Sequence, residues 1–137
     1  MDLRESIANQ TNVSLNVAKH LFSKESEKNI VFSPLSLQVV LSIIASGSEG
    51  PTQQQLFNFL QSKSTDHLNY FASQLVSVIL SDAAPAGGPL LSFVDGVWVD
   101  QTLSLQPSFQ QIVSTDFKAA LSSVDFQNKV CFYINSF

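Results

Sequence analysis

Asn29-Ile30-Val31-Phe32-Ser33-Pro34-Leu35-Ser36-Leu37 joins a short extended run to the start of a helix. Residues Ile30 to Phe32 are β-branched or aromatic, and this composition predicts a strand. Ser33 then offers a capping hydroxyl, and Pro34 has the fixed φ angle that suits the first helical position. Gly47 offers a left-handed stop. We therefore expect a strand that leads directly into a helix ending near Gly47.

The expected helix after Ser33 is apolar on more than one face. One face carries Leu37, Val40, Leu41 and Ile44, with Val39 and Ile43 beside it. A helix that is apolar nearly all round is typically surrounded by protein. The pattern predicts deep burial for this helix.

Helical spacing of apolar residues indicates three further helices in the first part of the chain. One precedes the opening segment and should end near Lys24–Lys28, a shorter one starts at Gly50-Pro51, and a third is capped by Ser64. Their expected inward residues are, in that order, Leu15, Ala18, Leu21 and Phe22; Leu56, Phe59 and Leu60; and Leu68, Phe71, Ala72, Leu75, Val78 and Ile79.

The second part of the chain alternates strand and helix signals. Turn residues from Ala83 to Pro89 predict a loop. We expect a strand from Leu90 to Asp100 that is apolar on both faces, a helix from Pro107 with Phe109, Ile112 and Val113 inward, and a strand from Ala120 to Phe126. A strand, a helix and a strand in this order favour a parallel crossover within one sheet. Val130 and Ile134 could begin one more helical turn.

Charge and length exclude several classes of function. The chain has 137 residues and a net charge of −4, and no Lys or Arg occurs from Ser64 to Phe117. No basic surface can form there, which argues against binding of nucleic acid or of a membrane surface. No apolar run approaches the roughly 20 residues needed to span a bilayer.

The N-terminus and the cysteine content favour an intracellular protein. Met1–Ser6 lacks the apolar run of a secretory signal, and the single Cys131 cannot form an internal disulfide. The sequons at Asn9 and Asn12 are then chance triplets. We expect the cytoplasm or the nucleus, although some members of the family named below are extracellular.

Residues able to carry chemistry are few and scattered. His20 and His67 are expected to be solvated helix residues, and no cluster has the spacing of a metal site. No nucleophile-elbow pattern occurs, and Cys131 is interpreted as an incidental thiol. Trp98 and the eleven phenylalanines fit core positions. We predict no catalytic, cofactor-binding or metal-binding residue, and no enzyme activity.

The opening segment and Leu41-Ser42-Ile43-Ile44-Ala45-Ser46-Gly47-Ser48-Glu49-Gly50 closely resemble the start of a serpin. Phe93-Val94-Asp95-Gly96-Val97-Trp98-Val99-Asp100 is similar to the second strand of the serpin central sheet, and Ser104-Leu105-Gln106-Pro107-Ser108-Phe109 to the start of the next helix. Gly-Val-Trp-Val-Asp, with Asp2-Leu3-Arg4-Glu5-Ser6-Ile7, is most similar to plant serpins of the Z type.

The resemblance implies an incomplete α+β fold of the multi-domain serpin type. N-terminal helices would be followed by two edge strands of the central sheet, with Ile30 to Phe32 belonging to a second sheet. Residues 1–137 would form a partial serpin domain that ends at the start of the helix crossing the central sheet. The sequence departs from the family at Asp95, where serpins usually have asparagine, and at Cys131-Phe132-Tyr133.

The resemblance also implies protease inhibition as the function of the family, and its absence in this chain. A serpin traps a serine or cysteine protease when its reactive loop is cleaved and inserts into the central sheet as an extra strand. That loop lies near the C-terminus of the family, so we expect a truncated, non-inhibitory protein without a reactive centre. Ser33 and Ser36 match the shutter region beneath the sheet and are assigned a structural role. The helix from Ser64 to Ser81 lacks the basic residues with which some serpins bind polyanions.

Two alternatives remain open. The chain could be an interaction module in which the uncovered edge of Leu90 to Asp100 pairs with another protein, for instance a longer serpin. It could also be the unstable product of a degenerate transcript, because helices without the sheet they cover expose apolar surface.

Overall fold

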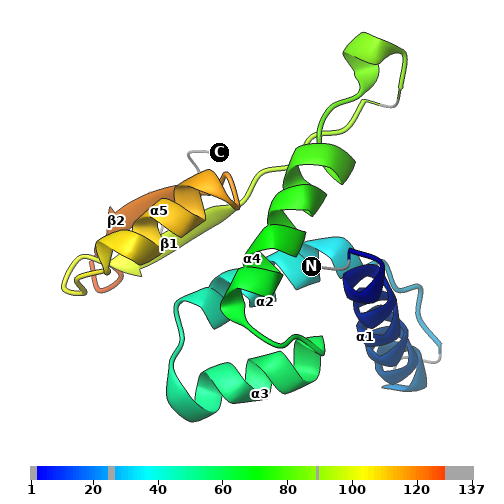
Figure 1. Ribbon diagram of the computed structural model, residues 1–137, viewed down its shortest axis with the longest axis horizontal. Coiled ribbons are helices and arrows are strands. Elements are labelled where there is room, and N and C mark those ends of the chain that lie inside the picture. Colours follow the sequence, from blue (N-terminus) through cyan, green and yellow to red (C-terminus); the bar gives the residue numbers. More distant parts are fainter. Residues whose placement is uncertain (1–2, 25–26, 89, 129–137) are drawn as a thin grey trace. The chain divides into compact units, whose positions relative to one another are not determined.

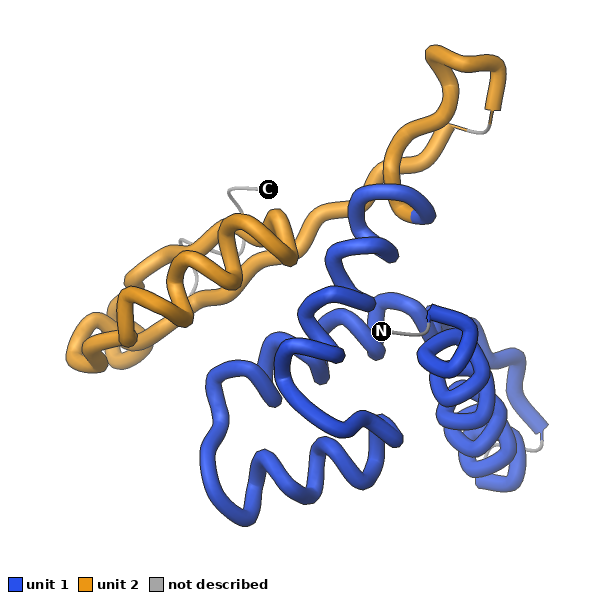
Figure 2. Tube along the Cα trace, in the orientation of Figure 1, with its two compact units in different colours: residues 1–79 blue, residues 80–137 orange. Residues whose placement is uncertain are grey.

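A computed structural model of the chain describes residues 3–24, 27–88 and 90–128. It contains helices and one strand pair, grouped into two compact units, Met1–Ile79 and Leu80–Phe137 (Figure 2). The elements in chain order are α1 (Leu3–Lys24), α2 (Pro34–Ser46), α3 (Gly50–Leu60), α4 (Thr65–Gln74), the π-helical turn η1 (Leu75–Ile79), the 3₁₀ turn η2 (Ala84–Ala86), β1 (Gly96–Asp100), α5 (Pro107–Thr115) and β2 (Ala120–Val124) (Figure 1).

The first unit is built around α2, which contacts both α3 and α4 (Figure 1). Ala45, Leu60 and Leu68, one from each of these helices, are buried together at its centre. Ser33 and Ser64 cap α2 and α4 as predicted, each accepting a hydrogen bond from a backbone N–H three residues later. The predicted helices of this unit are therefore confirmed, but the left-handed stop predicted at Gly47 is wrong, because Gly47 ends α2 at a φ of −95°.

The burial predicted for α2 is only partly right. Its fully buried side includes the polar Gln38 and Ser42, whereas Val40 and Ile44 are 42% and 48% exposed. The Ser42 hydroxyl donates to the Gln38 carbonyl at 2.8 Å, and Ser46 on the same helix donates to the Asn69 side chain of α4. The first bond lies within α2 and the second links α2 to α4, so these polar groups on the buried side of α2 have hydrogen-bond partners.

The strand predicted at Ile30 to Phe32 is wrong. These residues form no regular structure, and Val31 is 98% exposed. A β-type composition becomes a strand only when a neighbour supplies hydrogen bonds, and no described segment pairs with it. The serpin resemblance placed this run in a second sheet, and the described residues hold no other strand of such a sheet.

Several of the side chains expected to point inward lie outward. On α1, Leu15 is 63% exposed and Phe22 is also exposed, while Val13 is buried. Phe59 on α3 is exposed as well, although Leu60 beside it is buried. Val78 and Ile79 are exposed because the helix after Gln74 continues as the π-helical turn η1, whose wider winding rotates later residues away from the expected face.

The second unit is a parallel strand pair with one crossover helix, as predicted. β1 pairs with β2 in a register that sets Gly96 opposite Ala120 and Asp100 opposite Val124. Helix α5 packs against β2 (Figure 1). The buried centre consists of Val113, Phe117, Ala119 and Val124.

The predicted strand from Leu90 to Asp100 is longer than β1, because only residues Gly96 to Asp100 pair with β2. The predicted loop from Ala83 to Pro89 is confirmed for residues 83–88, with η2 inside it and Gly87 at a φ of 80°. The predicted helical turn at Val130 and Ile134, and Cys131, lie outside the described residues.

Candidate functional site

Ser33 and Ser36 form a small hydrogen-bonded turn at the start of α2. The Ser33 backbone is extended, and its hydroxyl oxygen accepts a hydrogen bond from Ser36 N at 3.2 Å. The Ser36 hydroxyl donates to the same oxygen at 2.9 Å. Ser33 is exposed and Ser36 is half-buried. The two hydroxyls thus bond to each other in one cap, and their role in a shutter stays a prediction.

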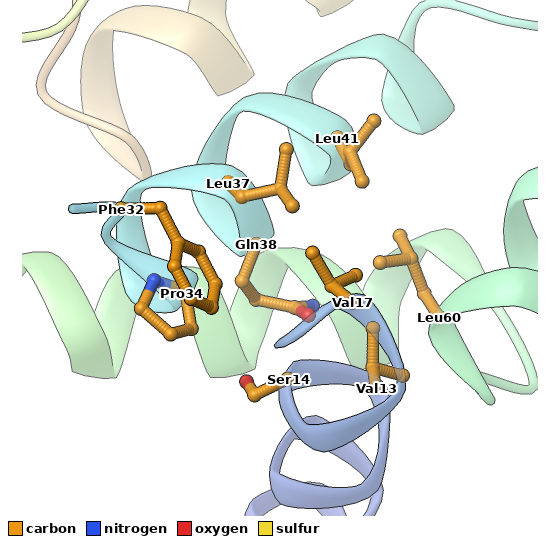
Figure 3. Close-up of a pocket in the computed structure, with 9 residues that line it drawn as sticks. All are labelled: Val13, Ser14, Val17, Phe32, Pro34, Leu37, Gln38, Leu41 and Leu60. Carbon is orange, nitrogen blue, oxygen red and sulfur yellow. The ribbon is translucent and has the colours of Figure 1, made fainter. Parts of the chain in front are cut away.

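The small pocket beside this turn is a packing contact (Figure 3). Phe32, just before α2, and Pro34 and Leu37 of α2 line one side of it, and Val13 and Val17 of α1 line the other. Its volume is about 10 Å³, which is room for one water molecule at most. The pocket holds α1 against α2 and is too small for a cofactor or a substrate.

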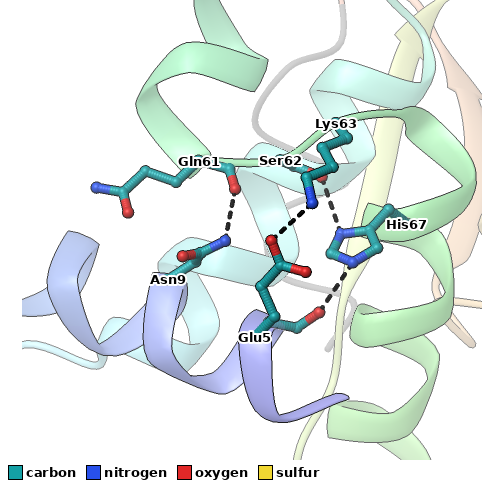
Figure 4. Close-up of polar contacts among 7 residues, drawn as sticks. Glu5, Asn9, Gln61, Ser62, Lys63 and His67 are labelled. Carbon is teal, nitrogen blue, oxygen red and sulfur yellow. Dashed lines mark hydrogen bonds and ion pairs between the residues drawn. The ribbon is translucent and has the colours of Figure 1, made fainter. Parts of the chain in front are cut away.

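His67 on α4 joins three segments of the first unit (Figure 4). Its Nε2 lies 3.3 Å from the hydroxyl of Ser6, which is buried on α1, and its Nδ1 lies 3.2 Å from the hydroxyl of Ser62. The prediction that His67 is merely solvated is therefore wrong, whereas His20 is exposed as expected. Ser6 and His67 are 61 residues apart, so periodicity within one helix could not have found the contact.

Two polar contacts flank His67 and connect α1 to the turn between α3 and α4 (Figure 4). The Asn9 side-chain amide donates to the Gln61 carbonyl at 2.8 Å, and Lys63 pairs with Glu5 at 2.7 Å. Gln61 is the C-cap residue of α3 and takes a left-handed φ of 53°. Its carbonyl oxygen is the one that accepts the hydrogen bond from Asn9. The cluster positions α1 on the rest of the unit.

The largest hollow that we describe is an apolar groove between α1 and the end of α4, here called the α1/α4 groove. Its volume is about 290 Å³. Phe71 and Leu75 are buried at its base, and Ile7 is 50% exposed. The full lining is Leu3, Ile7, Gln10, Leu35, Phe71, Gln74, Leu75, Val78 and Ile79. The sequence marked Phe71 to Ile79 as an apolar face but did not indicate that part of it stays open.

Gly96 gives the Trp98 indole its place on β1. A methyl group at Gly96 would lie 2.6 Å from Cζ3 and 3.1 Å from Cζ2 of that ring. Residues two apart on a strand share a face, so the ring lies over the glycine where no side chain opposes it. Trp98 is 38% exposed, so the expectation that it lies in the core is met only in part.

Three carboxylates lie at the ends of the two strands. Asp95 precedes β1, and its Oδ2 is buried without a hydrogen-bond partner among the described atoms. Burial therefore raises the pKa of Asp95. At the other end the hydrogen bond from the Thr102 hydroxyl, at 2.6 Å, lowers the pKa of Asp100. Hydrogen bonds from Asn128, first from its side chain and then from its backbone, lower the pKa of Asp125.

Neither a metal site nor a membrane span occurs in the part of the chain that the structure describes. Within residues 3–24, 27–88 and 90–128, no group of three His, Cys, Asp or Glu side chains could hold a metal ion. Among the same residues no helix is both long and apolar enough to cross a membrane.

Comparison with known proteins identifies the family. A family model described as Serpin (serine protease inhibitor) matches residues 8–137. The chain belongs to the serpin family. The predicted family is confirmed, and the arrangement of helices followed by two strands is that of the N-terminal part of the α/β serpin fold.

The similar serpins include plant proteins of the Z type. Serpin-ZX of Arabidopsis thaliana is 50% identical over 130 residues, which are 94% of this chain and 33% of that protein. Serpin-ZXA of Oryza sativa is 46% identical over 134 residues, 93% of this chain and 34% of that protein. The serpin chain described here thus spans about a third of the length of these relatives.

Solved serpin structures share its fold. The native stressed conformation of Arabidopsis AtSerpin1 matches with a TM-score of 0.85 and 49% identity, covering 94% of this chain and 33% of that one. Cleaved Serpin 42Da matches with a TM-score of 0.73 and 28% identity, covering 91% and 33%. The serpin likeness extends over nearly all of the present chain.

Proposed function

We propose that residues 1–137 form the N-terminal part of one serpin domain, to which both compact units belong. The match to the family model runs from residue 8 to residue 137 and so crosses from one unit into the other. The likeness to AtSerpin1 covers 94% of the chain and supports the same interpretation. In a complete serpin these residues would act as scaffold for the trap that meets a serine or cysteine protease.

We infer further that these residues by themselves do not inhibit a protease. Loop insertion requires two neighbouring strands that part and admit a third. The only sheet in the described residues has two strands, and they are hydrogen-bonded directly to each other. Inserting a strand between them would break that pairing and separate β2 from β1. This strand pair is the observation on which the proposal rests.

The test is a search for the covalent adduct. The purified 137-residue chain is incubated with trypsin, chymotrypsin and papain, and the products are examined by denaturing gel and intact mass, with a full-length inhibitory serpin as positive control. We expect cleavage fragments and full protease activity. A detergent-resistant adduct of chain and protease would overturn the proposal.

The side-chain geometry also favours a protein without enzyme activity. Ser6 and His67 are the components of a serine nucleophile and its base, but the second ring nitrogen of His67 contacts the Ser62 hydroxyl. A catalytic triad needs a carboxylate at that place to orient the imidazole, and the nearby Glu5 is paired with Lys63. We propose no cofactor and no metal for the chain.

A second candidate is an interaction module that adds a strand to its sheet from another protein. Its support is the small size of the sheet, because two-stranded sheets are marginal in isolation. Sedimentation of the dilute chain, alone and with a full-length serpin, tests this candidate. A monomer that ignores the longer serpin would exclude it.

The third candidate is an unstable product. Its support is the exposure of Val40 and Ile44, two large apolar side chains on the outer side of α2. Cooperative thermal unfolding, without binding of a hydrophobic dye to the native protein, would exclude this candidate.

We propose an intracellular location, in the cytoplasm or the nucleus, and no contact with nucleic acid or membrane. The side-chain amide of Asn9, the acceptor of one sequon, donates to the Gln61 carbonyl at 2.8 Å within a helical context. A glycan on that nitrogen would displace this contact. For Ser33 and Ser36 we propose a structural role as the cap of α2, at the position of the serpin shutter.

A further inference from the structure

The segment from Ala83 to Gly88, here called the Ala83–Gly88 loop, carries only small side chains. It consists of three alanines, Pro85 and two glycines, and none of its residues is charged. All of them are exposed except Ala83, which is half-buried, and the turn η2 within the loop has no buried residue. Exposed loop tips with small residues are preferred sites of proteolytic cleavage. The loop is therefore a candidate substrate segment.

Only local hydrogen bonds are seen to hold the loop in its sharp bend at residues 84–88 (Figure 2). The Ala83 carbonyl accepts from the backbone N–H groups of Ala86 and Gly88, at 3.0 Å and 2.9 Å. Asp82 Oδ1 accepts from Ala84 N at 2.9 Å. No side chain of the loop is buried in a core. A segment held in this way opens at little cost in free energy, so a protease can draw it into its cleft.

The residues of the loop also suit the extended conformation in which a protease binds its substrate. Pro85 has its φ fixed at about −65°, and it biases the preceding Ala84 away from helical and toward extended backbone. Gly87 has a left-handed φ of 80° in the folded loop. Glycine adopts extended backbone about as readily, so the change does not strain it.

The surroundings of each peptide bond favour cleavage between Ala86 and Gly87. The Ala84–Pro85 bond has no N–H on its leaving side. Ala83 is half-buried and its carbonyl accepts two hydrogen bonds, which keep the bond after it away from a protease. Cleavage after Ala86 instead presents one exposed methyl group to the S1 pocket. A small S1 pocket, as in elastase, matches such a side chain.

We propose that the Ala83–Gly88 loop is a cleavage site for a serine protease with a small S1 pocket, and that the Ala86–Gly87 bond is the one hydrolysed. The protease serine attacks the Ala86 carbonyl carbon, Gly87 leaves with a protonated amino group, and one water molecule then releases Ala86 as a carboxylate. Residues 1–86 are thereby separated from residues 87–137, which include the strand pair. The inference goes beyond the proposed function, because it makes the chain a substrate at a loop that is no reactive centre.

Val31 is the rival site for a protease of this specificity. It is 98% exposed, lies in irregular backbone and has a small apolar side chain. Phe32 after it is half-buried and lines the small pocket against α1, so binding around the Val31–Phe32 bond would pull this ring out of its contact. Cleavage after Ala86 disturbs no such packing.

The test is limited proteolysis of the native 137-residue chain with pancreatic elastase at a low ratio of protease to chain. The products are identified by intact mass and by N-terminal sequencing. We expect the first cut to yield residues 1–86 and a fragment that begins at Gly87. Trypsin, run in parallel, should leave the loop intact, because no Lys or Arg occurs from Ser64 to Phe117.

Two variants test which side chain enters the pocket. Ala86→Phe replaces the methyl group with a ring that a small S1 pocket rejects, and Ala84→Phe is the matched control at another exposed alanine of the same turn. Elastase cleavage before Gly87 should slow at least about tenfold in Ala86→Phe and less than about threefold in Ala84→Phe. Chymotrypsin, whose S1 pocket is a hydrophobic slot, should cut Ala86→Phe at the same bond and so report that the loop is still accessible.

Three results would overturn the inference. They are a first elastase cut at the Val31–Phe32 bond or elsewhere outside the loop, resistance of the loop while circular dichroism shows a folded chain, and cleavage of Ala86→Phe by elastase at the wild-type rate. The position of the cut reads this inference and the adduct assay reads the proposed function, so a failure of one does not imply a failure of the other.

Discussion

Gly96 is the residue whose replacement tests the strand pair most directly. The Cβ of an alanine at this position would lie 2.6 Å from Cζ3 of Trp98 and would also overlap Cη2 of the same ring. Real Cβ atoms do not approach carbon so closely, so Gly96→Ala must push the indole off the strand. The strand backbone can remain in place because the end of a side chain moves more easily.

The expected cost follows from the area that the ring would expose. A tryptophan buries about 150–250 Å², and moving its outer edge should expose about 60–80 Å², worth about 1.5–2 kcal/mol at about 25 cal/mol per Å². Replacing glycine by alanine in a strand otherwise gains about 0.5–1 kcal/mol. We expect a net loss of about 1 kcal/mol in the free energy of unfolding.

Trp98 reports the change itself, since it is the only tryptophan in the chain. In Gly96→Ala the native emission should shift to longer wavelength as the ring enters water, and the urea midpoint should fall. The control is the same substitution in a Trp98→Ala background, followed by circular dichroism. There the methyl group meets no ring, so Gly96→Ala should be neutral or stabilising. An equal loss in both backgrounds would refute the ring contact as the cause.

Three further predictions concern other described contacts. Ser64→Ala should lower the free energy of unfolding by about 1 kcal/mol, because the hydroxyl that caps α4 is lost; an unchanged midpoint in thermal denaturation would contradict the cap. His67→Ala should lower the free energy of unfolding by about 1–2 kcal/mol, because it removes the imidazole that the buried Ser6 hydroxyl contacts. Lys63→Ala breaks an exposed ion pair and should lower it by less than about 0.5 kcal/mol. Equal losses for the two variants in urea denaturation would refute this ranking. Burial raises the pKa of Asp95 above its ordinary 3.8, so the free energy of unfolding should fall as the pH rises from 3.8 through the raised pKa of the folded state. Asp95→Asn should remove this fall and be more stable than the wild-type chain at neutral pH. If the variant keeps the wild-type pH profile of unfolding, the buried Asp95 carboxylate is not its cause.

Local signals in the sequence were enough to place most elements. Ser33-Pro34 and Ser64 predict helix starts because a cap involves residues only three apart, and the structure confirms both. The order strand, helix, strand predicts a parallel pair because a crossover is needed to bring the second strand beside the first, and β1 and β2 are parallel. These features depend on neighbours along the chain.

The remaining features depend on contacts between distant segments. Ile30 to Phe32 has strand composition but no described partner, so propensity alone misled the prediction. The π-helical turn after Gln74 turns Val78 outward against the helical period. In the candidate site, the cap at Ser33 could be predicted, whereas the contact of His67 with Ser6 and the open groove depend on how α1 packs against α4.

The buried polar side of α2 has a consequence for how that helix is oriented about its own axis. A helix with apolar side chains on every side buries nearly the same apolar area in many rotations about its axis. The hydrophobic effect alone therefore does not select one rotation. The Ser46 hydroxyl reaches the Asn69 side chain of α4 in one rotation only, whereas the bonds to the carbonyls of Gln38 and Ser42 lie within α2 and persist in every rotation. The directional hydrogen bond between Ser46 and Asn69 therefore favours one rotation of α2, in which Val40 and Ile44 face outward.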